Sequence, residues 1–139
     1  MTSPENVGQQ FIHIYRGLED VTRLKDINTD SVGVHWTTSP DTAHEMAAPE
    51  WAVNEGMKPR GVVIHGTVKP EDVHSLSDPE MEGWENWRMD GDHWEQEKTL
   101  RHGTTVDIQG VEHVQNSKDG FSSRPAKRFP KKATVKWEL

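Results

Sequence analysis

The chain has 139 residues, of which 32% are hydrophobic and 28% are charged. This length and composition suit a single domain with a lean core. The sequence has no run of 18 apolar residues and no basic start followed by an apolar stretch, so we expect neither a membrane span nor a cleaved signal. The absence of cysteine excludes disulfides and thiolate chemistry. We therefore expect a soluble, cytoplasmic protein.

The formal net charge of -7 is unevenly distributed. Residues 1–117 carry 9 Lys and Arg against 21 Asp and Glu, whereas residues 118–139 carry 7 against 2. The acidic part should repel nucleic acid, so we expect no nucleic-acid partner. The basic tail either pairs with the acidic part of its own chain or contacts phosphate or an acidic partner.

Three segments in the first half of the chain are predicted to be strands. After a polar, turn-rich start at residues 1–10, the alternating stretch "FIHIYRG" at 11–17 is typical of a strand. The stretch "VGVHWTT" at 32–38 predicts a second strand, and "GVVIHGTV" at 61–68 predicts the clearest strand of the chain.

Residues 39–55 begin in a way that is typical of a helix. Ser39 is placed to be the N-cap, and Pro40 to be the first helical residue. Asp41 lies in the first turn, where a negative charge is favourable. Pro49 lacks a backbone donor, so the helix should kink or end there.

The second half of the chain is more polar. Residues 69–93 are predicted to be part helix and part acidic loop, and residues 95–114 to be two strands joined through the turn "RHG". Residues 115–133 are rich in Ser, Pro, Gly, Lys and Arg, which is typical of a linker, and residues 134–139 predict a last edge strand. Several short strands with little helix favour an α+β fold with a mostly antiparallel sheet.

Three short motifs follow one another along the chain: "YRG" at residues 15–17, "TTS" at 37–39 and "EQE" at 95–97. In this order they resemble the Arg–Ser/Thr–Glu class of mono-ADP-ribosyltransferases, a family that includes clostridial binary toxins and phage-encoded transferases. The stretch "GVHWTTSPDTAHEMA" is similar to small phage members of that family. The resemblance covers residues 11–114.

The resemblance implies an α+β, ADP-ribosyltransferase-like fold, in which two small and mostly antiparallel sheets with flanking helices surround an NAD cleft. It implies a flexible N-terminus at 1–10, a catalytic domain at 11–114, and a basic C-terminal segment at 115–139 with a possible edge strand. The implied activity is transfer of ADP-ribose from NAD to a protein with release of nicotinamide. In this family a Glu-x-Glu motif goes with arginine as acceptor, so the implied target is an arginine of a bacterial host protein.

The resemblance also implies roles for single residues. Arg16 would bind the NAD diphosphate, because a guanidinium presents a fork of donors, and Gly17 would let the phosphate approach the backbone. Glu97 would hold a ribose hydroxyl and stabilise an oxocarbenium-like transition state, and Thr37 would orient Glu97 or the ribose. The implied catalytic residues are Glu97, Arg16 and Thr37, and the implied NAD-binding residues are Arg16, Gly17, Trp36, Thr37, Thr38 and Ser39.

The resemblance implies that Trp94 and Glu95, which precede Glu97, bind the acceptor. Glu95 would accept hydrogen bonds from the target guanidinium and assist its deprotonation, and Trp94 would contact the target protein. Lys98 and Thr99 stand where the family usually has two apolar residues, so the sequence leaves the register of Glu97 open. No spacing of His, Asp and Glu matches a zinc signature, and we expect no metal.

Each motif also has a structural alternative. Arg16 could pair with a surface carboxylate, residues 37–39 could serve only as a strand end and an N-cap, and Glu97 could be a solvated charge. Trp36 could stack on nicotinamide, although large aromatic side chains more often fill a core. Two alternative functions also stay open: an NAD glycohydrolase that passes ribose to water, and a non-catalytic binding module on the same fold.

Overall fold

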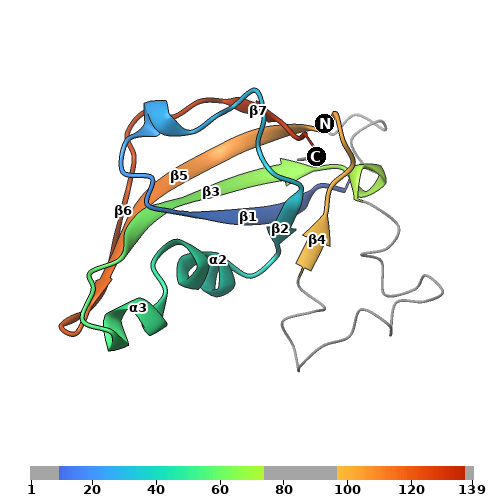
Figure 1. The fold of residues 1–139 in the computed structure, drawn as a ribbon. Helices are drawn as coiled ribbons and strands as arrows, with labels where there is room; N and C mark the ends of the chain where they lie inside the picture. Colours follow the sequence, from blue (N-terminus) through green and yellow to red (C-terminus); the bar gives the residue numbers. More distant parts are fainter. Residues whose placement is uncertain (1–9, 74–96, 137–139) are drawn as a thin grey trace, which may run out of the picture.

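The computed structural model describes residues 10–73 and 97–136, and these residues form one sheet of seven strands (Figure 1). The strand order is β4-β2-β1-β3-β5-β6, β7 also pairs with β5, and these pairs are antiparallel. The strands are β1 (Ile12–Glu19), β2 (His35–Thr37), β3 (Arg60–Val68), β4 (Glu97–Thr99), β5 (Thr105–Ser117), β6 (Gly120–Pro125) and β7 (Lys132–Thr134).

The prediction of an α+β fold with a mostly antiparallel sheet is confirmed, but the prediction of two sheets is wrong. The sheet stays single because β5 has 13 residues and pairs along its length. One edge of β5 pairs with β3. The other edge pairs with β7 near its start and with β6 near its end, so the C-terminal strands extend the same sheet.

The helices begin where the sequence predicts. The Oγ of Ser39 accepts a hydrogen bond from the backbone N–H of Thr42 at 3.2 Å, which makes Ser39 the N-cap of α2 (Pro40–Ala47). Pro49 ends this helix and is the N-cap of α3 (Glu50–Asn54), so the predicted interruption is confirmed. Two short 3-10 turns complete the described elements, η1 (Leu24–Asp26) and η2 (Pro70–Asp72).

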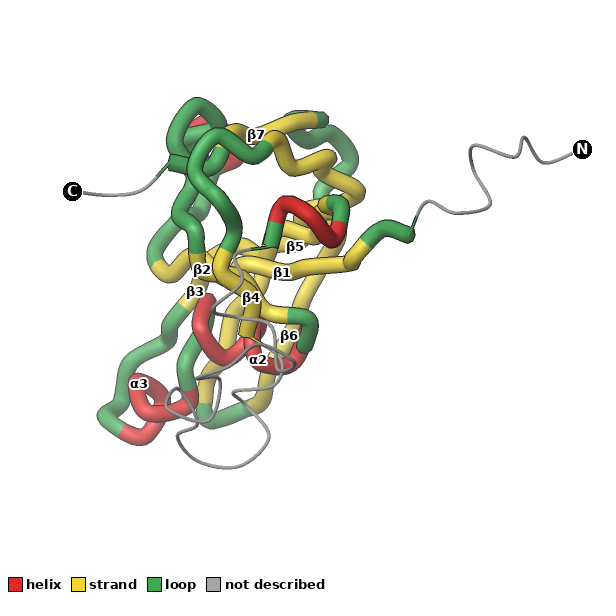
Figure 2. Tube along the Cα trace, turned by 90° about the vertical axis from the view of Figure 1, so that its right-hand side faces the viewer, coloured by secondary structure: helices red, strands yellow, loops and turns green. Residues whose placement is uncertain are grey.

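The two faces of the sheet are covered by different elements. Helix α2 lies against one face, which we call the helix face, where Ala43 and Ala47 pack with Val63 and Val114 (Figures 1 and 2). The opposite side, the core face, carries the larger hydrophobic cluster. Its buried members are Ile14, Ile27, Val32, Val34, Trp36, Val62, Ile64, Val68, Leu100, Val106, Ile108, Val111, Ala133 and Val135.

The core face is covered by the chain that precedes β2 and by β7. Val32 and Val135 form an isolated parallel bridge. The N–H of Val32 donates to the carbonyl of Thr134 at 2.9 Å, and the N–H of Lys136 donates to the carbonyl of Val32 at 3.0 Å. Because these bonds join the segment before β2 to the far side of the sheet, the sheet curls around its own core.

The strands predicted at 11–17, 32–38 and 61–68 are confirmed as β1, β2 and β3. The linker predicted at 115–133 is wrong, because this stretch contains the end of β5 and all of β6. All six residues of β6 are exposed, so its sequence lacks the alternation that marks a half-buried strand. The edge strand predicted at 134–139 shares only Thr134 with β7, and residues 137–139 lie outside the described part of the chain. Within the described residues, no helix has the length and apolar character that crossing a membrane requires.

Gly17 allows α2 to pack closely on β1. A Cβ at this position would overlap the carbonyl oxygen of Ala43 and would lie 2.8 Å from the backbone nitrogen of Ala47. Because both neighbours are backbone atoms, they cannot move aside without shifting the helix. We expect Gly17→Ala to lower the free energy of unfolding by about 1–3 kcal/mol, as overpacked cores do.

Urea denaturation of Gly17→Ala, compared with Gly110→Ala, checks this expectation. A Cβ at Gly110 would meet nothing within 4 Å. Gly110→Ala therefore measures how replacing a glycine in a strand changes the free energy of unfolding when no overpacking occurs. Equal stability changes in the two variants would contradict the close-packing role of Gly17.

Candidate active site on strands β1, β2 and β4

The register of the sheet places four side chains in one row on the helix face. Glu97 on β4 is the cross-strand partner of Thr37 on β2, and Thr37 is the partner of Tyr15 on β1. Tyr15 is in turn the partner of His65 on β3. Antiparallel partners project from the same face with Cβ atoms roughly 4.5–5.5 Å apart. The fold therefore brings Glu97 beside Thr37, although they are far apart in the sequence.

Thr37 is held in place by the start of α2. Its side chain is buried, with 4% of the residue exposed, and its Oγ1 accepts a hydrogen bond from the backbone N–H of Ser39 at 3.0 Å. A threonine hydroxyl that accepts one bond still has a proton to donate. Thr37 is thus a fixed hydroxyl group on the cross-strand partner of Glu97, as the predicted orienting role requires.

Glu97 is the accessible end of the row. Its side chain is 54% exposed, and its Oε1 lies 3.7 Å from Nδ1 of His35. The Oγ1 of Thr99 lies 3.5 Å from the same nitrogen. Such an exposed pair contributes little to stability and leaves the carboxylate open to a ligand. No motif in the sequence pointed to His35, although its spacing of two from Thr37 places both side chains on one face of a strand.

Arg16 projects from the core face, because it follows Tyr15 on β1 and successive strand residues alternate. Its Nη1 donates to the carbonyl oxygen of His35 at 2.6 Å. A Cβ at Gly33 would lie 2.7 Å from Cζ of Arg16, so the glycine makes room for the guanidinium against the chain that enters β2. The predicted catalytic residues therefore lie on three neighbouring strands, but only Thr37 and Glu97 share a face.

The other predicted NAD-binding residues have different surroundings. Trp36 is 2% exposed, packs in the cluster on the core face, and donates from Nε1 to the carbonyl of Gly33 at 2.8 Å. It fills the core, which is the structural alternative for this residue. The Cα of Gly17 is covered by α2, Ser39 is the N-cap of α2, and Thr38 lies half-buried between β2 and α2.

The row ends in a small aromatic cluster. The rings of Tyr15 and His65 stack, with centroids 4.6 Å apart and an angle of 14° between the planes. Nε2 of His65 lies 3.1 Å from Nδ1 of His13. Burial lowers the pKa of His65, the charge of His13 lowers it further, and Glu112 opposes the shift. His65 is therefore neutral at neutral pH.

The lowered pKa of His65 makes stability depend on pH. The unfolded chain binds a proton at this histidine near its ordinary pKa of about 6.5, before the folded protein does. Above the ordinary pKa, His65 is neutral in both states and does not lower the free energy of unfolding. As the pH falls from there through the lowered pKa of the folded state, protonation of the unfolded chain lowers the free energy of unfolding. We expect urea denaturation to show a falling free energy of unfolding from pH 7 downwards, and a weaker pH dependence in His65→Gln.

His102→Gln is the matched control for this prediction, since His102 is exposed and lies in the turn between β4 and β5. A pH dependence that is unchanged in His65→Gln, or equally weakened in His102→Gln, would show that other groups cause it.

Trp94 and Glu95 lie outside the described residues, so their role in binding the acceptor stays a prediction. In the part of the chain that the structure describes, no three His, Asp or Glu side chains are placed to hold a metal ion. Comparison of the chain with protein families, with curated proteins and with solved structures finds no match.

Proposed function

We propose that this protein is an NAD-dependent mono-ADP-ribosyltransferase that modifies an arginine of a protein target. The observation that carries the proposal is the meeting of three distant motifs on adjacent strands. The "YRG" motif lies on β1, the "TTS" motif ends β2, and the last residue of "EQE" begins β4. These strands are neighbours in the order β4-β2-β1. Strand pairing thus brings Thr37 and Glu97 onto one face, with Arg16 on the adjacent strand and the opposite face.

Glu97 is the central catalytic residue of the proposed site. Breaking the bond between nicotinamide and ribose leaves positive charge on the sugar, and a carboxylate beside it stabilises that charge. The exposure of Glu97 gives the carboxylate access to a ribose. Thr37 lies next to it as a fixed hydroxyl group and orients the carboxylate or a ribose hydroxyl. His35 is a positioning residue that holds the carboxylate from its other side.

Arg16 supports the site from the core face. Its bond to the carbonyl of His35 positions the backbone of β2, on which Thr37 lies. A guanidinium has five N–H donors in a fork that matches the oxygens of a diphosphate. We assign the NAD diphosphate to Arg16 on this basis.

The transfer step needs an acceptor as well as a leaving group. The bond from ribose to nicotinamide breaks with its electron pair going to nicotinamide, and a guanidinium nitrogen of the target arginine bonds to the same carbon. We assign Glu95 to accept the proton that this nitrogen loses. The acidic main part of the chain, with a net charge of -12 over residues 1–117, favours a cationic arginine side chain as acceptor over a nucleic acid.

The test is an incubation of the full chain with NAD labelled in its ADP-ribose part and a bacterial lysate. The expected result is a labelled protein band, released nicotinamide, and a modified arginine in the mass spectrum of that band. If the wild-type chain neither releases nicotinamide nor labels any protein, the proposed function is wrong.

A further inference from the structure

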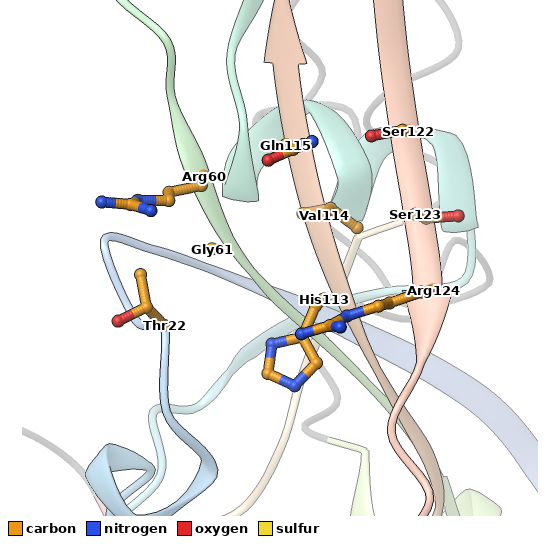
Figure 3. A pocket seen from close by; sticks show the side chains of 9 residues that line it. All are labelled: Thr22, Arg60, Gly61, His113, Val114, Gln115, Ser122, Ser123 and Arg124. Carbon is orange, nitrogen blue, oxygen red and sulfur yellow. The ribbon is translucent and has the colours of Figure 1, made fainter.

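A second candidate site lies at the other end of the sheet. A cavity of about 370 Å³ opens beside the start of β3, the end of β5 and the middle of β6 (Figure 3). The residues that matter for its chemistry are Thr22, Arg60, His113, Ser122 and Arg124. A second cavity of about 430 Å³ adjoins it, shares Arg60, and adds Lys58. Neither cavity is lined by Arg16, Thr37 or Glu97.

The strand register explains why these side chains meet. Across β3, β5 and β6, Arg60 is the partner of Gln115, and Gln115 is the partner of Ser122. Two residues before Gln115 on β5, His113 is the partner of Arg124 on β6. Residues two apart on a strand share a face, so both arginines, the histidine and the serine project from the same side. Figure 3 shows Thr22 approaching this side from the loop after β1.

The charge of the two cavities differs from that of the chain. The chain has a net charge of -7 with 23 Asp and Glu, yet none of the described carboxylates lines either cavity. Among the residues that the structure describes, the ion pairs involve neither Arg60 nor Arg124. Two arginines therefore line one cavity without forming an ion pair to any described carboxylate, which is an arrangement suited to an anion.

The form of these donors favours phosphate among the anions. Arginine presents a planar fork of N–H donors that matches two phosphate oxygens. Hydroxyl groups of Thr22 and Ser122 add neutral donors around the same space. A compact anion is held mainly by these local groups, whereas an extended polyanion such as a nucleic acid would also meet the negative charge of the whole chain.

We propose that this cavity binds the phosphate or diphosphate group of a small molecule, held between Arg60 and Arg124. This site is distinct from the proposed NAD site. Arg60 opens β3, whereas His65, the partner of Tyr15, lies five residues further along the same strand, which is about 17 Å in an extended chain. The proposal stands on its own geometry and does not depend on the transferase activity.

The test uses inorganic phosphate and pyrophosphate as probes of the full chain. In two-dimensional NMR of the 15N-labelled protein, we expect saturable shifts at the amides of Gly61, Ser122, Ser123 and Arg124. In calorimetry, Arg60→Gln and Arg124→Gln should each weaken pyrophosphate binding about tenfold or more, since each removes a charge-assisted hydrogen-bonding group. Arg124→Lys should weaken it less, because lysine keeps the charge and loses only the fork.

Two controls separate this site from general charge effects and from the proposed transferase. Lys132→Gln removes one positive charge beside Asp107 at the opposite end of β5, and it should leave binding unchanged. Glu97→Gln should also leave these amide shifts unchanged. Circular dichroism of each variant establishes that it is folded before binding is compared.

Four outcomes would overturn the proposal. The first is no saturable shift at these amides with pyrophosphate up to about 10 mM, where even a millimolar site is mostly filled. The second is an equal loss of binding in Lys132→Gln and in the arginine variants. The third is pyrophosphate shifts confined to β1 and β2. The fourth is tighter binding of a single-stranded oligonucleotide than of pyrophosphate at the same amides, which would replace a small molecule by a nucleic acid.

Discussion

Glu97→Gln is expected to lower both ADP-ribose transfer and nicotinamide release by at least about 10²–10³-fold, the usual effect of removing one group that stabilises charge in a transition state. The amide keeps the shape of the side chain and loses only its negative charge. Because the side chain of Glu97 is 54% exposed and pairs with the exposed side chain of His35, the fold should be unaffected. Labelled NAD with a lysate measures transfer, and chromatography of free nicotinamide measures cleavage.

Glu55→Gln is the matched control for Glu97→Gln, because Glu55 is exposed at the end of α3 and away from β4. It should retain full activity. Full activity of Glu97→Gln would remove Glu97 from the proposed mechanism and, with it, the assignment of the row on the helix face as an active site. Equal losses in Glu97→Gln and Glu55→Gln would show an effect of overall charge.

Glu95→Gln is expected to separate the two halves of the reaction. Transfer to arginine should fall by about 10²-fold or more, the usual contribution of a general base, whereas nicotinamide release should remain near the wild-type rate. The reason is that Glu95 is assigned to the acceptor, while Glu97 is assigned to the ribose. The same two assays, run in parallel on Glu95→Gln and Glu97→Gln, measure the difference.

The wild-type chain provides the comparison for the Glu95 prediction. Loss of both activities in Glu95→Gln would show that the first glutamate also acts on NAD. Nicotinamide release by the wild-type chain without any labelled arginine would instead identify an NAD glycohydrolase, for which Glu95 has no acceptor to deprotonate.

Local patterns in the sequence predicted most of the elements. The alternating stretch at 11–17 became β1 and the apolar stretch at 61–68 became β3, because half-buried and buried strands must carry apolar side chains. The helix start at Ser39 and its interruption at Pro49 followed from capping and from the missing backbone donor of proline. Strand β6 was not predicted, because its side chains are all exposed and show no apolar pattern. It is a strand because it pairs with β5.

The residues of the candidate site were readable from the motifs, but their arrangement was not. The sequence named Arg16, Thr37 and Glu97 and left the register around Lys98 open. Pairing of β2 with β4 sets Thr37 opposite Glu97 and Trp36 opposite Lys98, which puts the carboxylate beside the hydroxyl and the tryptophan in the core. Arg16 lies on the other face because neighbouring strand residues alternate.

The sequence by itself determined the α+β class, the helix caps, and the residue types available for chemistry, since these depend on composition and on neighbours along the chain. Tertiary structure alone decided that there is one sheet and not two, that His35 lies beside Glu97, and that Arg60 and Arg124 face one cavity. Each of these depends on the register between strands distant in the sequence, which is set by the packing of the whole sheet.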